Sequence, residues 1–187
     1  MSQSPSTFKL RLAAEYLAAG GVVCHPTEAV WGLACLPNNE QAVARLIELK
    51  QRDPEKGLIL VADKVERFAP LMAKLPADAQ QQLLASWPGP NTWVVPDTEV
   101  VPVWVRGRFD SVAIRVSKHP LTAALCAAAD SPLVSSSANP AGRQPAKTLW
   151  QAWSHFAHEV DYFLHGVTDR QQKPTTIRDA LSGARIR

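Results

Sequence analysis

The sequence is poor in the residues and motifs that mark most metal and disulfide sites. Its three cysteines lie at 24, 35 and 126, and no two have the close spacing of a zinc or redox pair. Its five histidines form no H-E-x-x-H pattern, and no serine lies in a G-x-S-x-G motif. We therefore expect a reducing compartment, no disulfide framework and no protein-bound metal, and neither a metal hydrolase nor a serine hydrolase.

Long apolar runs and a strong excess of one charge are also lacking. No stretch approaches the roughly 20 apolar residues that span a bilayer, and the first residues show no basic segment followed by an apolar one. The formal net charge of +3 is a smaller excess than that of a dedicated nucleic-acid binder. These features predict a soluble, cytoplasmic protein without a membrane partner.

No Gly/Ser tract or charge block divides the chain, and 46% of its residues are hydrophobic, enough to bury one core. Apolar spacing predicts an opening helix that ends near Gly20. It predicts a second helix, capped by Asn38 or Asn39, that closes by about Arg52, because Asp53 before Pro54 is pushed out of the helical conformation. Strands and helices alternate and some strands follow one another directly, so we predict one α/β domain over residues 1–187, with a twisted mixed sheet flanked by helices. Further helices are expected at 65–72, 77–86, 120–128 and 148–157, and strands at 21–25, 29–35, 58–62, 91–95, 101–105, 111–116, 133–135, 160–164 and 175–179.

Three cations follow the predicted second helix. Lys50 and Arg52 can reach one ligand only if the helix ends between or just after them, and Asp53-Pro54 supplies that end. Together with Lys56 they would form a grip suited to a triphosphate. The alternative is that they complement the helix dipole, while Asp53 and Glu55 neutralise them.

A run of serines leaves a later predicted strand. The two-residue period of a strand places Ser135 and Ser137 on one face and Ser136 on the other. Asn139 precedes Pro140 and is held extended, so its amide could contact a phosphate or a ribose; a polar loop with an Asx turn explains the same residues. Since no P-loop and no G-x-G-x-x-G motif occurs, any phosphate would be held by side chains.

Two further polar stretches lie where strands end or begin. Thr27 and Glu28 offer a hydroxyl and a carboxylate for a small polar substrate such as an amino acid, or form only a turn. Residues 173–176 (KPTT) offer hydroxyls beside a lysine, although threonine is also ordinary at the start of a strand.

Taken together and in order, these motifs resemble those of the YrdC-like threonylcarbamoyl-AMP synthases, in their short bacterial form. The resemblance spans nearly the whole chain. It departs from the family pattern at Ala29, where a second hydroxyl is common, at Leu36, where an acid is common, and at Asp53, where a proline is common. The matching segments are 25–33 (HPTEAVWGL), 48–52 (ELKQR), 56–60 (KGLIL), 87–92 (WPGPNT), 113–116 (AIRV) with 119–120 (HP), 135–139 (SSSAN) and 175–179 (TTIRD).

The resemblance implies a YrdC-like fold with a basic concave face and a reaction of L-threonine, bicarbonate or CO2, and ATP to threonylcarbamoyl-AMP and pyrophosphate, for the threonylcarbamoyladenosine modification of tRNA. Mg²⁺ would arrive with the nucleotide. Direct tRNA binding and delivery to a downstream threonylcarbamoyl transferase complex are possible partnerships. The alternative is a non-catalytic RNA-binding or ribosome-assembly accessory protein that uses the same cleft. By motif, ATP would be bound by Lys50, Arg52, Lys56, Thr92, Ser137 and Asn139, with Lys50 and Arg52 catalytic, and threonine by Thr27, Ser135, Arg115 and Thr175.

Overall fold

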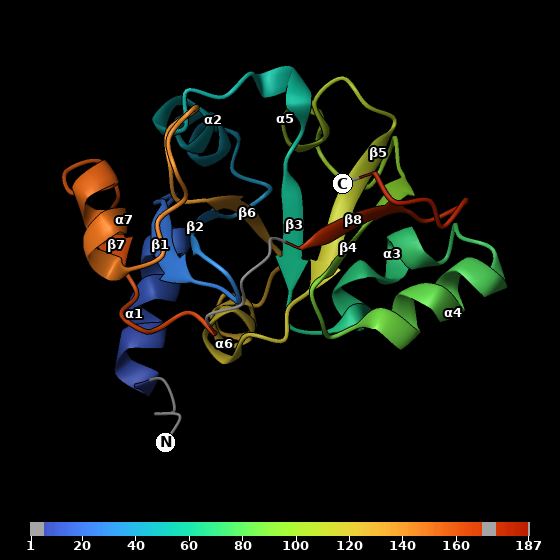
Figure 1. The fold of residues 1–187 in the computed structure, drawn as a ribbon, viewed down its shortest axis with the longest axis horizontal. Helices are drawn as coiled ribbons and strands as arrows, with labels where there is room; N and C mark the ends of the chain where they lie inside the picture. Colours follow the sequence, from blue (N-terminus) through green and yellow to red (C-terminus); the bar gives the residue numbers. More distant parts are fainter. Residues whose placement is uncertain (1–5, 170–174, 187) are drawn as a thin grey trace.

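A single mixed β-sheet with helices on both faces organises the computed structural model, which describes residues 6–169 and 175–186 (Figure 1). Part of the predicted 173–176 stretch, Lys173 and Pro174, lies outside these residues. In the described chain the strand order is β7-β1-β2-β6-β3-β5-β4-β8, with parallel pairs at β1–β7, β3–β5 and β4–β8. The predicted mixed α/β sheet is therefore confirmed. The strands are β1 Val23–Pro26, β2 Trp31–Cys35, β3 Ile59–Ala62, β4 Asn91–Pro96, β5 Ser111–Val116, β6 Leu133–Ser137, β7 Tyr162–Phe163 and β8 Thr176–Asp179.

The predicted helices are present, with local differences at their ends. The second one begins after Asn39, whose Oδ1 accepts a hydrogen bond of 2.9 Å from the backbone N–H of Ala42. The stretch predicted at 65–72 is a 3₁₀ turn followed by one α-helical turn that has Pro70 near its start. The helical elements are α1 Thr7–Ala18, α2 Glu40–Leu49, η1 Pro54–Lys56, η2 Val65–Phe68, α3 Ala69–Met72, α4 Ala77–Ser86, α5 Val103–Arg106, α6 Pro120–Ala128 and α7 Leu149–Phe156.

The predicted strand at 101–105 is wrong, because this segment contains the short helix α5. The carboxylate of Asp97 accepts hydrogen bonds from the backbone N–H groups of Glu99, Val100 and Val101, at 3.1, 2.9 and 2.8 Å. These bonds turn the chain before Pro102, which is the N-cap residue of the helix. Side-chain capture of backbone donors thus overrides the β-propensity of the valines.

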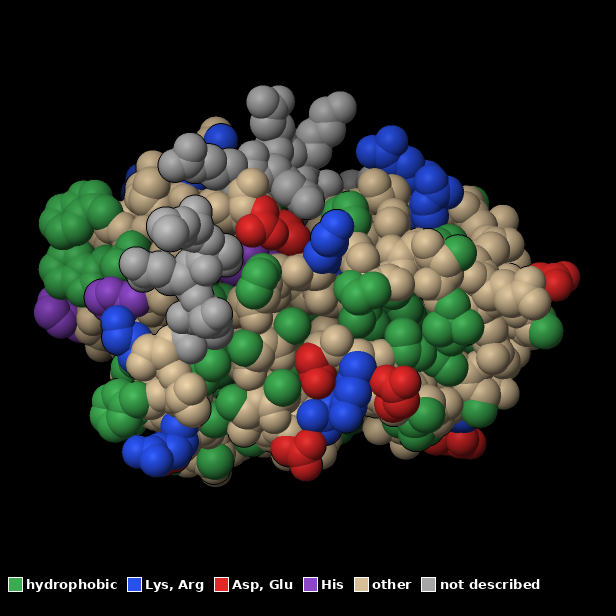
Figure 2. All heavy atoms as spheres, turned by 90° about the horizontal axis from the view of Figure 1, so that it is seen from below, with side chains coloured by type: hydrophobic (Ala, Val, Ile, Leu, Met, Phe, Trp, Pro, Cys, Tyr) green, Lys and Arg blue, Asp and Glu red, His purple; other side chains and the backbone are tan. Residues whose placement is uncertain are grey.

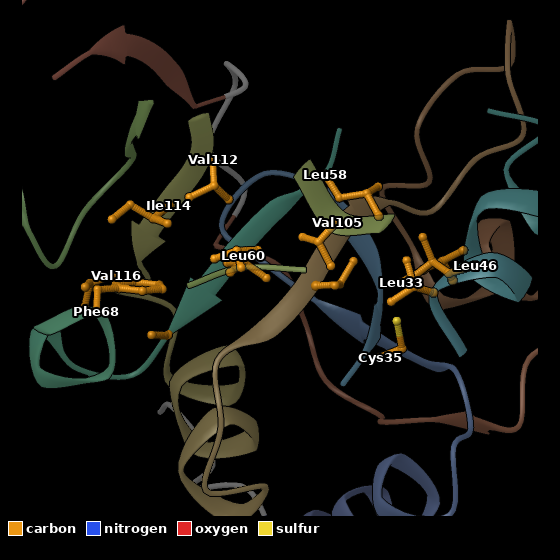
Figure 3. Packing of buried hydrophobic residues seen from close by; sticks show 14 of the residues in the cluster. Leu33, Cys35, Leu46, Leu58, Leu60, Phe68, Val105, Val112, Ile114 and Val116 are labelled. Carbon is orange, nitrogen blue, oxygen red and sulfur yellow. The ribbon is translucent and has the colours of Figure 1, made fainter. Parts of the chain in front are cut away.

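One face of the sheet packs against α2, η2, α3, α4, α5 and α7. Figure 3 shows Leu33 of β2, Leu60 of β3 and Ile114 of β5 together with Leu46 of α2, Val105 of α5 and Phe68 of η2. These residues are at most 3% exposed. Burying each such side chain contributes about 1.5–3 kcal/mol, so this layer is the main core of the protein.

The opposite face is covered over only part of its area. Val61 and Leu133 pack there against Leu17 of α1 and Leu125 of α6, and Figure 1 shows these two helices together below the sheet. Further along the same strands, small and polar residues replace the apolar ones. Because a strand has a two-residue period, Gly32, Ile59, Ala113 and Ser135 lie on this second face, beyond the two helices.

Helix α7 buries one side and exposes the other. Ala152 and Phe156 are buried, whereas Trp150 and Trp153 are 71% and 43% exposed and stack on each other with ring centroids 5.3 Å apart. Figure 2 shows hydrophobic side chains next to histidine at the end of the molecule where α7 lies in Figure 1. No helix within the described residues is both long and apolar enough to cross a bilayer.

Candidate active site

A cavity of about 520 Å³ lies over the uncovered part of the second face. Its wall is built from strands β2, β3, β4, β5, β6 and β8, together with the β1–β2 turn and the segment around η1. Arg52, Lys56, Arg106 and Arg115 line it, and no Asp or Glu of the described residues does. Arg106 lies 3.9 Å from the carboxylate of buried Asp97, which neutralises it. Arg115 is likewise paired, with Glu28 at 3.4 Å, so Arg52 and Lys56 supply most of the positive charge that suits the wall to anionic ligands.

The structure brings most of the predicted site residues to this cavity. Lys50 and Asn139 are not among the residues of its wall. Two of the departures from the family pattern lie in different places. Ala29 lies in the cavity wall, whereas Leu36 is half-buried and packs against the apolar cluster between the second face of the sheet and helices α1 and α6. Of the predicted residues, the wall includes Thr27, Arg52, Lys56, Thr92, Arg115, Ser135, Ser137 and Thr175.

Lys50 points into the protein and fastens the loop that follows β6. Helix α2 ends in a Schellman motif, in which Gln51 has a φ of 49° and the N–H of Arg52 bonds to the carbonyl of Ile47. Lys50 is 5% exposed, and its Nζ donates to the carbonyl oxygens of Ser137 and Asn139. Burial and the nearby Arg52 lower the pKa of Lys50 to about 8.

Arg52 and Lys56 follow the end of α2 and, unlike Lys50, line the cavity. The helix ends before Arg52, as predicted, but the end lies at Leu49, before Lys50, and Lys50 and Arg52 do not face one ligand space: Arg52 lines the cavity and Lys50 does not. Nη2 of Arg52 donates to the carbonyl of Gly57 at 2.9 Å, while Lys56 is exposed at the end of η1. The carboxylate of Asp53 accepts the backbone N–H of Glu55 at 2.9 Å, so it caps η1.

The serines occupy the strand positions that the sequence predicts, although β6 runs two residues further, to Ser137. Ser135 pairs with Ala34 and Ser137 with Gly32, which places both on the cavity face. Asn139 donates through Nδ2 to the carbonyls of Pro140 and Arg143, at 3.0 and 2.9 Å. Its Oδ1 is buried and has no hydrogen-bond partner in the described structure. The Asn139 amide therefore shapes a turn and keeps one unused acceptor.

Three threonines bring hydroxyl groups to the cavity. Thr27 donates through Oγ1 to the carbonyl of Val30 at 2.7 Å, which closes the turn between β1 and β2. Thr92 on β4 is fully buried, and its Oγ1 lies 3.5 Å from Oγ1 of Thr175, just before β8. Thr92, which is predicted to bind ATP, and Thr175, which is predicted to bind threonine, are therefore direct neighbours.

Glu28 does not line the cavity, so of the two interpretations of this stretch, substrate ligand or turn, the first does not hold for Glu28. It is 1% exposed, and its Oε2 lies 3.4 Å from Nη2 of Arg115. Burial raises the pKa of Glu28, but the Arg115 charge and the Ser117 hydrogen bond outweigh it and hold that pKa below its ordinary value. Burial also lowers the pKa of Arg115, while Glu28 opposes that shift.

Ser117 belongs to the same network and was missed from the sequence. Its Oγ donates to Oε1 of Glu28 at 2.7 Å and accepts the backbone N–H of His119 at 3.1 Å. The sequence does contain a signal for Ser117, because this polar residue comes directly after the apolar strand β5. Polar residues at the ends of predicted strands are the same feature that indicated the other site residues.

The Sua5/YciO/YrdC family model, described as "Telomere recombination", matches residues 15–187. The chain belongs to this family. Among its relatives are the threonylcarbamoyl-AMP synthases of Marinobacter nauticus, 48% identical over 100% of this chain and 98% of that protein, and of Hahella chejuensis, 48% identical over 97% and 99%. The family resemblance predicted from the motifs is thereby confirmed.

Solved structures of the Sua5/YciO/YrdC family share the fold. The structure of P. abyssi Sua5 complexed with L-threonine is 30% identical and superposes with a TM-score of 0.89, over 96% of this chain and 53% of that one. E. coli YciO is 22% identical, with a TM-score of 0.86 over 100% and 94% of the two chains, and supports the fold alone.

Proposed function

We propose that this protein is a threonylcarbamoyl-AMP synthase, which condenses L-threonine, bicarbonate or CO2, and ATP to threonylcarbamoyl-AMP and pyrophosphate. The observation that carries the proposal is the cavity itself, where cationic groups and hydroxyls meet on one wall. Relatives of nearly the same length, 48% identical, bear the name of this enzyme. The non-catalytic RNA-binding or ribosome-assembly alternative is not favoured.

ATP would lie along the part of the wall that carries Arg52, Lys56, Thr92 and Ser137. Guanidinium and ammonium groups bind phosphate oxygens strongly through charge-assisted hydrogen bonds, which compensates for the missing P-loop. Lys50 and Asn139, behind this wall, would support it by holding the loop after Ser137. Of the two predicted catalytic residues, Arg52 is the one that would contact the nucleotide.

Threonine would lie beside the nucleotide, near Arg115, Thr27, Ser135 and Thr175. The Arg115 guanidinium is the natural partner for the substrate carboxylate, and the hydroxyls of the other residues suit its amino and hydroxyl groups. P. abyssi Sua5, a structural relative, has been solved with L-threonine.

The chemistry then requires little beyond positioning. The threonine amine captures CO2 as a carbamate, a carbamate oxygen attacks the α-phosphorus of ATP, and pyrophosphate leaves with the bonding electron pair. Holding the two substrates side by side and neutralising the phosphate charge accelerate such a displacement. The 3.5 Å approach of Thr92 to Thr175 supports adjacent sites for the two substrates.

Further partners belong to the same proposal. Mg²⁺ would be carried by the ATP phosphates; no group of three His, Cys, Asp or Glu side chains that could hold a metal occurs in the described structure. The product would pass, in the cytoplasm, to a threonylcarbamoyl transferase complex that modifies tRNA, and direct tRNA binding would use the same positive wall.

Pyrophosphate release tests this function. The protein is incubated with ATP, bicarbonate and labelled L-threonine, and pyrophosphate and labelled nucleotide are measured with each substrate omitted in turn. We expect release that depends on both threonine and bicarbonate. Release at background level, together with steeply salt-dependent tRNA binding, would favour the RNA-binding alternative.

A further inference from the structure

Arg115 is a buried guanidinium at the cavity wall with part of its hydrogen-bonding capacity unused. It is 7% exposed, and its Nη2 lies 3.4 Å from Oε2 of Glu28. Its Nε is buried without a hydrogen-bond partner among the described residues. Since a guanidinium has five N–H donors, Arg115 keeps donors for an anionic group that enters the cavity.

Glu28 is itself fixed from the side away from Arg115. Its Oε1 accepts hydrogen bonds from Oγ of Ser117 at 2.7 Å and from the backbone N–H of Lys118 at 3.2 Å. Ser117 is in turn bonded to the backbone of His119. One carboxylate oxygen is therefore tied to the segment after β5, and the other is left facing the guanidinium.

This contact crosses the sheet. Glu28 lies in the turn between β1 and β2, whereas Arg115 belongs to β5, and β6 and β3 lie between β2 and β5 in the strand order. The network therefore fixes the position of the Arg115 guanidinium relative to both halves of the cavity wall. A surface ion pair would not do this, because its side chains remain free to move.

We propose that Glu28 and Ser117 are positioning residues of the amino-acid subsite, which hold the Arg115 guanidinium at the cavity wall to receive the carboxylate of threonine. This inference rests on the proposed function and extends it to two residues outside the wall. Neither residue touches the substrate, and both act through Arg115. The competing role for Glu28 is simple charge neutralisation, under which the geometry of Arg115 would not depend on it.

Glutamine at position 28 separates these roles. Glu28 accepts hydrogen bonds from Ser117 and Lys118 through Oε1, while its Oε2, which has no hydrogen-bond partner among the described residues, faces Nη2 of Arg115 at 3.4 Å as an ion pair. A glutamine amide has one oxygen and one NH2 group, so in either orientation it turns a donor toward a donor. In Glu28→Gln the guanidinium is therefore displaced, although the side chain keeps its size.

The test compares Glu28→Gln and Ser117→Ala with Asp63→Asn as the matched control. Asp63 forms a partly buried ion pair of 3.1 Å with Arg67, with both side chains 14% exposed, and does not line the cavity. KM values for threonine and for ATP are measured by pyrophosphate release. Calorimetry measures the binding of L-threonine and of L-threonine amide, which lacks the carboxylate, in the absence of ATP.

We expect Glu28→Gln to raise the threonine KM at least tenfold, to leave the ATP KM within twofold, and to reduce the preference for threonine over its amide. Ser117→Ala should act in the same direction by about threefold, and Asp63→Asn should change neither KM. An unchanged or lower threonine KM in Glu28→Gln means that Glu28 only neutralises Arg115, and overturns the proposal. If Glu28→Gln does not fold, an unchanged KM in Ser117→Ala overturns it.

The calorimetric arm separates this inference from the proposed function. Wild-type protein that binds threonine but releases no pyrophosphate refutes the synthase function, and weaker threonine binding by the variants then still supports the positioning role. Absence of threonine binding to the wild type overturns both.

Discussion

The ammonium group of Lys50 lies 2.7 Å from the backbone carbonyl oxygen of Asn139, 89 residues further along the chain. It also donates to the carbonyl of Ser137, and the carbonyl of Lys50 accepts the N–H of Ala141 at 2.8 Å. The end of α2 and the loop after β6 are therefore joined by one residue. These hydrogen bonds hold two of the segments proposed to bind the nucleotide against each other.

Replacing Lys50 by methionine tests the connection between the end of α2 and the loop after β6. Loss of the ammonium leaves two carbonyls without their donor, so we expect Lys50→Met to reduce the free energy of unfolding by about 1.5–3 kcal/mol. Urea denaturation followed by circular dichroism measures the change. Lys56→Met is the control, because Lys56 is exposed, and its stability should stay within about 0.5 kcal/mol of the wild type. Equal denaturation midpoints for Lys50→Met and the wild type would contradict the role of Lys50.

Arg52 should matter for the nucleotide instead. If it binds a phosphate oxygen, Arg52→Ala removes a charge-assisted interaction of about 1.5–3 kcal/mol, which lowers kcat/KM for ATP roughly tenfold to a hundredfold. Steady-state pyrophosphate release at varied ATP measures it. Arg45→Ala provides the control, since Arg45 lies on α2 but pairs with Asp161 outside the cavity. An effect of the same size in both variants would argue against a phosphate contact at Arg52.

The neighbouring hydroxyls of Thr92 and Thr175 should report on different substrates. Valine keeps the shape of threonine but removes the hydroxyl, worth about 0.5–1.5 kcal/mol for a neutral hydrogen bond. We expect Thr92→Val to raise the KM for ATP and Thr175→Val the KM for threonine, each about two- to tenfold. Cross-titration of both substrates measures these shifts. If both variants change only the threonine KM, Thr92 belongs to the amino-acid subsite.

His25 should make the protein less stable in mild acid. It is fully buried, and burial lowers its pKa from 6.5 to about 4, with Glu28, Arg115 and His119 as neighbouring charges. The unfolded chain binds the proton more readily, so the stabilisation is complete above pH 6.5 and is lost as the pH falls toward 4. The loss is on the order of 3 kcal/mol.

Denaturation midpoints at pH 7.5, 6, 5 and 4.5 measure this dependence. Protonation of Glu28 causes a further loss of stability, mainly below pH 4.5, because the pKa of Glu28 in the folded protein is lowered from its ordinary value of 4.5. His25→Gln should flatten the profile between pH 6.5 and 4.5, whereas His165→Gln, at an exposed position, should not. A slope that His25→Gln leaves unchanged would assign the acid sensitivity to another group.

Apolar periodicity predicted most elements because their inward faces are strongly patterned, as at Leu33 and Cys35 on β2 or Leu46 on α2. The strand order could not be predicted, since nothing local in the sequence states that β1 pairs with β7 or that β8 lies beside β4. The error at Val103–Arg106 has a similar origin. The turn that precedes this helix depends on the Asp97 side chain, several residues away.

For the site, residue chemistry predicted the members of the cavity wall better than their orientation. Lys50 and Arg52 look equivalent as cations, yet the turn at the end of α2 sends the Lys50 side chain inward and the Arg52 side chain toward the cavity. Glu28 looks like a substrate ligand beside Thr27, but it is drawn to Arg115, which only the folded sheet brings near. Contacts between residues far apart in the sequence decide which way these side chains point, and the spacing of residues along the chain does not predict those contacts.

Strand β8, which follows Thr175 and carries Ile177, forms one edge of the sheet and belongs to the last described segment. Because the residues that line the cavity run from Thr27 to Ile186, its wall is complete only when segments from both ends of the described chain have joined the sheet. Ligand binding therefore requires nearly the whole fold to be in place. Neither ATP nor threonine can help the earlier segments to fold by binding to a finished site.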